Sequence, residues 1–239
     1  MKRLCINIDH IATLREARGG VEPDPAHSVF ICENAGASGI VCHLREDRRH
    51  INDRDLKILR EIVNTKLDLE MAATEEMKRI ALETLPELVT LVPEKRQELT
   101  TEGGLDVIKN REYLRTFIPS LQEKGIEVSL FIDPIKDQID VAAELGSNFI
   151  EIHTGEYANA RDEREIEHQL KRIKTGAEHA FKLGMKVNAG HGVNYLNAHK
   201  LLEIKEIEEM SIGHSILSRA VFVGLDRAVR DMVEIFGKY

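Results

Sequence analysis

Four pairs of polar residues, each two positions apart, could carry acid–base chemistry. They are Asn7/Asp9, His43/Arg45, Asp68/Glu70 and Glu151/His153. Residues two apart on a strand point to the same face, so each pair would present two polar groups on one side. Burying such groups is costly unless they serve a purpose. The spacing therefore predicts a polar site in which carboxylates and imidazoles exchange protons.

Eight short apolar segments are expected to form the strands that position these pairs. They are residues 4–8, 39–43, 66–70, 87–92, 127–132, 148–153, 186–189 and 209–212. Helical patterns separate them, and this alternation indicates parallel pairing. Eight such units in 239 residues predict an α/β fold, a (β/α)8 TIM barrel, formed by residues 1–239 as a single domain. An open doubly wound sheet is the alternative, but the first turn lacks a GxGxxG motif.

The expected helices begin with recognisable signals. One spans residues 24–37, after an Asp-Pro start, and others follow the N-cap candidates Asn52 and Thr74. A further helix is expected near residues 106–124, and a long charged one within 155–185. The segment after the first strand, "NIDHIATLREARGG", is interpreted as a turn and a loop that carries Arg18.

Histidines gather where the predicted strands end. Five of the ten histidines lie at or just past a strand end, and His50 is near one; the five are His10, His43, His153, His191 and His214. Active sites of this barrel class lie at the carboxyl ends of the strands. One histidine alone could be structural, but this joint placement predicts a catalytic rim.

Two glycine-flanked turns indicate a phosphate site. "NAGHG", with Gly190 and Gly192, follows the seventh strand, and "IGHSI", with Gly213, follows the eighth and opens a helix. The loops after strands seven and eight often hold phosphate in this fold. Arg45, on the same face as His43, is a second candidate anion contact.

Nearby arginines are expected to brace their loop. Arg48 and Arg49 lie among the acids Glu46, Asp47 and Asp53, and pairing with them is the favoured interpretation. A lysine that could form a Schiff base is missing from the strand mouths, since only Lys95 lies near the rim. Any imine chemistry would therefore use an amine supplied by the substrate.

Composition excludes several classes of protein. The net charge of −8 and pI of about 5.7 argue against general nucleic-acid binding. No apolar segment is long enough for a bilayer, and the N-terminal residues do not resemble a secretory leader. Three cysteines without CxxC spacing, and the absence of HxH and HExxH, predict reduced thiols and no metal. A cytoplasmic protein is expected.

Several longer motifs resemble one family. They are "NIDHIATLREARGG", "HLREDRRHI", "LEMAATEEM", "LVPEKRQELTTEGGLD", "FIEIHTGEYA", "KVNAGHG" and "SIGHSILSRAV". Together they resemble the pyridoxine 5′-phosphate synthase family of bacterial vitamin B6 synthesis, across almost the whole chain. The resemblance implies a (β/α)8 barrel with extra helices, an octamer, and no metal or organic cofactor. The implied reaction condenses 3-amino-2-oxopropyl phosphate with 1-deoxy-D-xylulose 5-phosphate to pyridoxine 5′-phosphate, phosphate and water.

The resemblance also implies residue roles. It implies that His43 and Glu70 are general bases, that His191 donates a proton and that Glu151 stabilises a transition state. The implied contacts of the amino ketone phosphate are Asn7, Arg18, Gly192, Gly213 and His214. Those implied for the deoxyxylulose phosphate are Asp9, His10, Arg45, His50 and Thr100. The "TTEGG" loop would act as a lid over the site.

The residues alone leave other functions open. A phosphate-binding barrel could be an isomerase or a lyase acting on sugar phosphates, or a non-catalytic protein that binds a phosphorylated metabolite. Retention of the acid–base set favours an enzyme, and product formation from the two substrates would distinguish these possibilities.

Overall fold

The computed structural model describes residues 2–94 and 103–239, and it shows a closed barrel of parallel strands. Strand order around the barrel follows the chain from β1 to β8, which pairs with β1. The strands are β1 (Arg3–Asn7), β2 (Gly39–His43), β3 (Leu67–Met71), β4 (Leu88–Leu91), β5 (Glu127–Ile132), β6 (Phe149–His153), β7 (Lys186–Gly190) and β8 (Ile207–Ile212). The predicted (β/α)8 fold is confirmed, and each strand end lies within two residues of its prediction.

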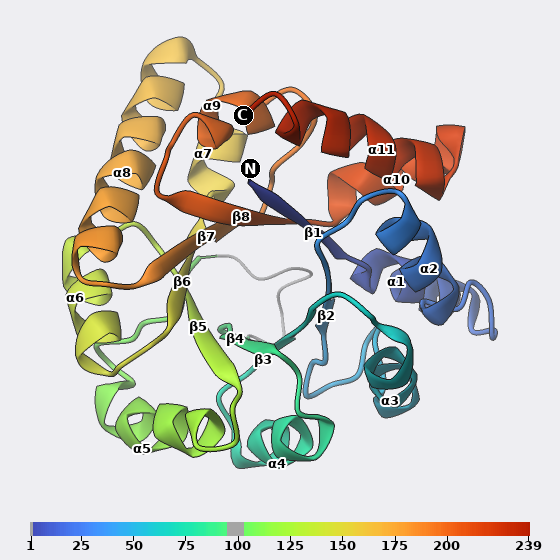
Figure 1. Ribbon diagram of the computed structural model, residues 1–239, viewed down its shortest axis with the longest axis horizontal. Coiled ribbons are helices and arrows are strands. Elements are labelled where there is room, and N and C mark those ends of the chain that lie inside the picture. Colours follow the sequence, from blue (N-terminus) through green and yellow to red (C-terminus); the bar gives the residue numbers. More distant parts are fainter. Residues whose placement is uncertain (1, 95–102) are drawn as a thin grey trace.

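Helices surround the barrel (Figure 1). They are α1 (Asp9–Arg18), α2 (Ala26–Asn34), α3 (Asp53–Ile62), α4 (Glu75–Thr84), α5 (Arg111–Gln122), α6 (Lys136–Glu144), α7 (Gly155–Asn159), α8 (Glu163–Lys182), α9 (Ala198–Leu202), α10 (His214–Val223) and α11 (Leu225–Phe236). Both predicted N-caps are confirmed: Asn52 accepts a hydrogen bond from the backbone N–H of Asp55, and Thr74 from that of Met77. The predicted 106–124 helix is shorter, and the 155–185 segment holds two helices.

The interpretation of the segment after β1 as a loop is wrong. It forms α1, a ten-residue helix with Asp9 in its first turn and Arg15 and Arg18 in its last turn. These charges suit the helix dipole, and Gly19 ends the helix in the left-handed conformation with φ of 69°. Arg18 is thus the last residue of a helix, and Asp9 begins that helix rather than ending a strand.

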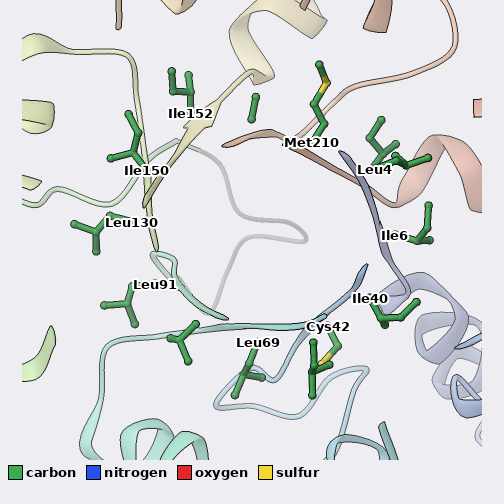
Figure 2. Packing of buried hydrophobic residues seen from close by; sticks show 14 of the residues in the cluster. Leu4, Ile6, Ile40, Cys42, Leu69, Leu91, Leu130, Ile150, Ile152 and Met210 are labelled. Atoms are coloured by element: carbon green, nitrogen blue, oxygen red, sulfur yellow. The ribbon is translucent and has the colours of Figure 1, made fainter. Parts of the chain in front are cut away.

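The two faces of the strands differ in polarity. Apolar side chains such as Leu69, Ile152 and Met210 point outward from the barrel, where helices cover them (Figure 2). The inward face carries several buried polar side chains beside apolar ones such as Val41 and Leu88; the polar ones are Asp68, Thr90, Ser129, Asn188 and Glu209. Most barrels of this class fill this space with branched apolar residues. The polar interior continues directly into the rim where the strands end.

The described residues bear on two further expectations, a membrane span and the state of the cysteines. No helix there combines the length and apolarity needed to cross a membrane. Cys5, Cys32 and Cys42 are free and buried, as predicted for reduced thiols, and burial raises the pKa of Cys32 to about 12.

Candidate active site

The ends of β1, β2 and β3 bring four predicted residues into contact. The register places His43 beside Glu70, and the His43 Nδ1 lies 3.9 Å from a Glu70 carboxylate oxygen. Asn7 donates hydrogen bonds from Nδ2 to Asp9 at 2.9 Å and to Glu70 at 3.3 Å. Asp9 in turn accepts the backbone N–H of His43 at 2.8 Å. Strand pairing and the start of α1 together fix this cluster.

Glu94 is a site residue that the sequence analysis did not assign. One of its carboxylate oxygens lies 2.9 Å from His43 Nε2, and the other accepts the backbone N–H of Glu46 at 3.1 Å. Burial alone would raise the pKa of Glu94, but these hydrogen bonds hold it below its usual value. His43 therefore lies between two carboxylates, Glu70 and Glu94. In the sequence, the one feature that pointed to Glu94 was its place in the "VPEKRQ" motif.

Buried carboxyl groups lie below this cluster. Burial, followed by the negative charges of Glu151, Asp9 and Asp68, raises the pKa of Glu70 well above its usual value. Burial and the neighbouring Asp68 and Glu209 raise the pKa of Glu151 to about 8. Burial likewise raises the pKa of Asp68 to about 7, although Lys66 opposes this. With a pKa of about 8, Glu151 therefore holds its proton at neutral pH, where an exposed carboxylate would have lost it.

The loop after β7 packs tightly against the carboxyl groups. A Cβ at Gly190 would lie 2.1 Å from Glu151 Oε1, and a Cβ at Gly192 would lie 2.4 Å from the Ala158 Cβ. Between these two glycines, His191 has a φ of 76°, which is unusual for a residue other than glycine. The Thr154 hydroxyl donates to the carbonyls of Gly190 and His191 at 2.7 and 2.6 Å. Burial, followed by the nearby His153, lowers the pKa of His191 to about 4.

The turn after β8 meets the end of β1. A Cβ at Gly213 would lie 2.9 Å from the carbonyl oxygen of Asn7. His214, the first residue of α10, packs its ring edge-on to His10 with 5.1 Å between ring centres. Burial lowers the pKa of His10 below its usual value. Gly213, His214, Asn7 and His10 are thus neighbours, as a shared anion site requires.

The loop after β2 contains both site residues and bracing residues. The buried Arg45 contacts Asp47 at 3.3 Å, and the His50 ring lies 6.0 Å from that of His43. Arg48 pairs with Asp53 and with Glu76, and Arg49 pairs with Asp47. The bracing predicted for Arg48 and Arg49 is confirmed. His50 lies close to His43, and Arg45 lies close to Glu94.

Two predicted residues are not brought into this site by the described contacts. Arg18 is exposed, and it lies about 14 Å along α1 from Asp9, given the rise of a helix. Thr100 lies outside the described residues, as do Lys95 and the first part of the "TTEGG" loop. Their suggested roles stay predictions.

Asp9, His43 and Glu70 could also act as metal ligands. Each offers one donor atom, and the three atoms lie within 4.8 Å of one another. However, Asp9 accepts hydrogen bonds from Asn7 and from the His43 backbone, and His43 Nε2 faces Glu94. The donor atoms are therefore already engaged in contacts with neighbouring residues.

The chain matches the family model described as pyridoxal phosphate biosynthesis protein PdxJ over residues 4–238. The chain belongs to this family. The pyridoxine 5′-phosphate synthase of Geotalea uraniireducens (strain Rf4) is 59% identical over 235 residues, 98% of each chain. The protein of the same name from Geobacter sp. (strain M21) is 61% identical over 235 residues, again 98% of each chain.

Two solved structures with low sequence identity share the fold of this chain. KGPDC from Streptococcus mutans matches with a TM-score of 0.65 at 12% identity, covering 100% of this chain and 99% of its own. The tryptophan synthase A-subunit from Pyrococcus furiosus matches with a TM-score of 0.64 at 11% identity, covering 98% of both chains. These two similarities support the barrel fold alone.

Proposed function

We propose that this chain is a pyridoxine 5′-phosphate synthase that condenses 3-amino-2-oxopropyl phosphate with 1-deoxy-D-xylulose 5-phosphate. The products would be pyridoxine 5′-phosphate, inorganic phosphate and water. The observation that carries the proposal is the buried cluster of His43, Glu70 and Glu151 beside two glycine-flanked turns. Family membership and relatives near 60% identity support the same activity.

Two phosphorylated substrates need two separate anion contacts. Gly192, Gly213 and His214 offer one, because backbone without a side chain lets a phosphate approach closely at the start of α10. Arg45 and His50 offer the second, on the loop after β2. We assign the amino ketone phosphate to the first, with Asn7 and Arg18, and the deoxyxylulose phosphate to the second, with Asp9, His10 and Thr100.

In the described part of the chain, the lysines next to β3 and β7 lie away from the mouth of the barrel, which suits an imine formed by the substrate's own amine. Lys66 precedes β3 at the opposite end of the barrel, where its ammonium pairs with Glu209. Lys186 begins β7, also at that end, and pairs with Glu127. The amine of the amino ketone would therefore attack the sugar carbonyl itself, and the enzyme would supply proton transfers.

The assigned proton transfers follow from local surroundings. Glu70 and His43 lie 3.9 Å apart, so either could accept a proton that the other then stabilises. Glu151, with a pKa of about 8, is protonated at neutral pH and could donate a hydrogen bond to a developing oxyanion. We assign to His191, in the loop after β7, the protonation of a leaving oxygen. Repeated dehydration and ring closure need several such groups.

Product formation tests this proposal against its alternatives. The purified protein would be mixed with both substrates in the presence of a chelator, and pyridoxine 5′-phosphate would be followed by its absorbance. We expect product under these conditions, which also tests the proposal that no metal or cofactor is required. Isomerisation of a sugar phosphate without this product would favour the isomerase or lyase, and binding without turnover would favour a non-catalytic barrel.

The proposal extends to the whole molecule. We propose that residues 1–239 form one catalytic domain, that the protein acts in the cytoplasm, and that it assembles as a homo-oligomer, an octamer. Large apolar side chains at the surface support assembly: Val21 is 84% exposed and Phe222 is 87% exposed. Only small phosphorylated molecules are proposed as substrates, with no nucleic acid and no membrane partner.

A further inference from the structure

A second histidine adjoins His191 and has no role in the reaction as derived above. His153 ends β6, and its ring contacts that of His191 edge-on, with 5.1 Å between ring centres. On its other side it packs against Phe131, with 5.2 Å between ring centres. His153 is buried, so its orientation is set by these neighbours. It therefore touches the proposed proton donor and lies in a fixed position.

The Asp133 carboxylate holds the His153 ring by a hydrogen bond. Asp133, one residue after β5, lies 2.9 Å from His153 Nδ1 through Oδ1. This hydrogen bond is the main cause that lowers the pKa of Asp133, so the carboxylate is ionised and can only accept. Nδ1 therefore carries the proton. The second Asp133 oxygen accepts the backbone N–H of Gly104 at 3.2 Å, which anchors the carboxylate itself.

The first residue of α7 holds the two imidazoles together. A Cβ at Gly155 would lie 2.4 Å from His153 Nε2 and 3.1 Å from His191 Cδ2. Both rings thus approach the same glycine, and any side chain there would push them apart. An opening of about 470 Å³ is lined by both histidines together with Gly155. The two rings therefore form one unit at the edge of the proposed active site.

We propose that His153, held by Asp133, is a positioning residue that fixes the ring orientation and the charge state of His191. This inference rests on the proposed function, in which His191 donates a proton. Burial and the nearby His153 lower the pKa of His191, so His191 is neutral at neutral pH. The edge-on contact with His153 limits how the His191 ring can turn. The arrangement matches the orienting carboxylate–imidazole pairs of other acid–base sites.

Charged groups lie around the two histidines on each neighbouring element. Asp133 follows β5, Glu151 lies on β6, Glu156 on α7, and Glu165 and Arg172 on α8. Glu156 pairs with Arg172, so these two charges largely offset each other. Glu165 accepts a hydrogen bond from Gln169. Asp133 is the carboxylate in direct contact with His153, which makes it the charge to remove in a test.

The test uses His153→Gln and Asp133→Asn in the full-length protein. We expect each to lower kcat by roughly 10- to 100-fold, as when an orienting group is lost. KM for both substrates should stay within about threefold, because neither residue is assigned to substrate binding. His168→Gln and Asp137→Asn are matched controls, since both side chains are exposed on outer helices.

Histidine titration by NMR separates positioning from a merely structural role. Replacing the His153 ring in His153→Gln should raise the pKa of His191 above about 4, while burial, the larger cause, still holds it below its ordinary value. In Asp133→Asn the proton of His153 should no longer reside mainly on Nδ1. Unchanged His191 titration, or kcat within about twofold of wild type, would overturn the inference. If wild type made no pyridoxine 5′-phosphate, the proposed function would fail, and the NMR result would still decide the link between the two histidines.

Discussion

At the scale of single residues, surroundings rather than residue type separate the roles in this site. Glu94 accepts hydrogen bonds from His43 and the backbone, which favour its ionised form. Glu151 is surrounded by other carboxyl groups and burial raises its pKa to about 8. Two glutamates in one site are thus prepared for opposite tasks, the ionised one as a hydrogen-bond acceptor and the protonated one as a donor.

The raised pKa of Glu151 predicts a cost to stability that depends on pH. Below about pH 4.5 Glu151 is protonated in both the folded and the unfolded protein. Between about pH 4.5 and about pH 8 it is ionised in the unfolded protein alone. Each pH unit in that window should lower the free energy of unfolding by about 1.4 kcal/mol. Glu151→Gln stays neutral and escapes this loss.

Melting temperatures of wild type and Glu151→Gln at pH 5 and pH 8 would measure this effect. We expect the variant to gain stability relative to wild type as the pH rises. An equal difference at both pH values would contradict the raised pKa.

The sequence pointed to the polar residues on the strands, but not to Glu94, which contacts one of them. His43, Glu70 and Glu151 were identified because they lie on strands, where alternation determines which face each residue shares. Glu94 was not assigned, because it lies three residues beyond β4, in a connection whose path depends on tertiary packing. Its partner His43 is 51 positions away in the sequence, and no local pattern links them.

At the scale of elements, short glycine-containing turns bring the chemistry to the rim. The close approach of the β7 loop to α7 depends on Gly192, whose φ is 78°. The helix α1, which was interpreted as a loop, carries Asp9 and His10 into the same region. Its helical pattern was readable, but treating Asp9 as a residue at the end of a strand concealed that α1 begins at Asp9.

Two glycines with the same backbone preference allow a matched test of the β7 loop. Gly192 and Gly184 have φ of 78° and 87°, but only a Cβ at Gly192 would meet a neighbour, Ala158 at 2.4 Å. Gly184→Ala should therefore cost about 1 kcal/mol of stability and leave KM unchanged. Gly192→Ala should also displace the loop and raise KM for the amino ketone phosphate by roughly tenfold, equivalent to the loss of about one hydrogen bond.

Steady-state kinetics and urea unfolding of both variants would measure these effects. Equal KM values in the two variants would show that the loop contact does not support phosphate binding.

At the scale of the whole molecule, the barrel is stabilised from outside and polar within. Its apolar core lies between the strands and the helices, whereas Asp68, Asn188 and Glu209 occupy the interior. The alternation of strand and helix patterns predicted the fold class. Polar residues were predicted at the ends of the strands but not inside the barrel. Their burial there depends on how the strands align when the barrel closes.

Large apolar side chains exposed at the surface support assembly into an oligomer. Val221 and Phe222 are 76% and 87% exposed at the end of α10, and Phe30 of α2 is 75% exposed. Light scattering should give a particle of about eight times the 27.1 kDa chain mass. We expect Phe222→Asp to reduce that mass, because burying an unpaired carboxylate in an apolar contact is costly. Phe222→Leu is the matched control, and equal masses for all three proteins would contradict a role for this residue in assembly.

Turnover by Glu70→Gln, with both substrates and chelator present, shows whether Glu70 is the catalytic base. A carboxamide has nearly the same shape as the carboxylate but cannot accept the proton, so kcat should fall by roughly 10²- to 10⁴-fold. Binding of both substrates, measured by calorimetry, should be retained because Glu70 is assigned to neither phosphate. A folded Glu70→Gln variant with wild-type kcat would contradict the assignment of the catalytic base and, with it, the mechanism proposed for this site.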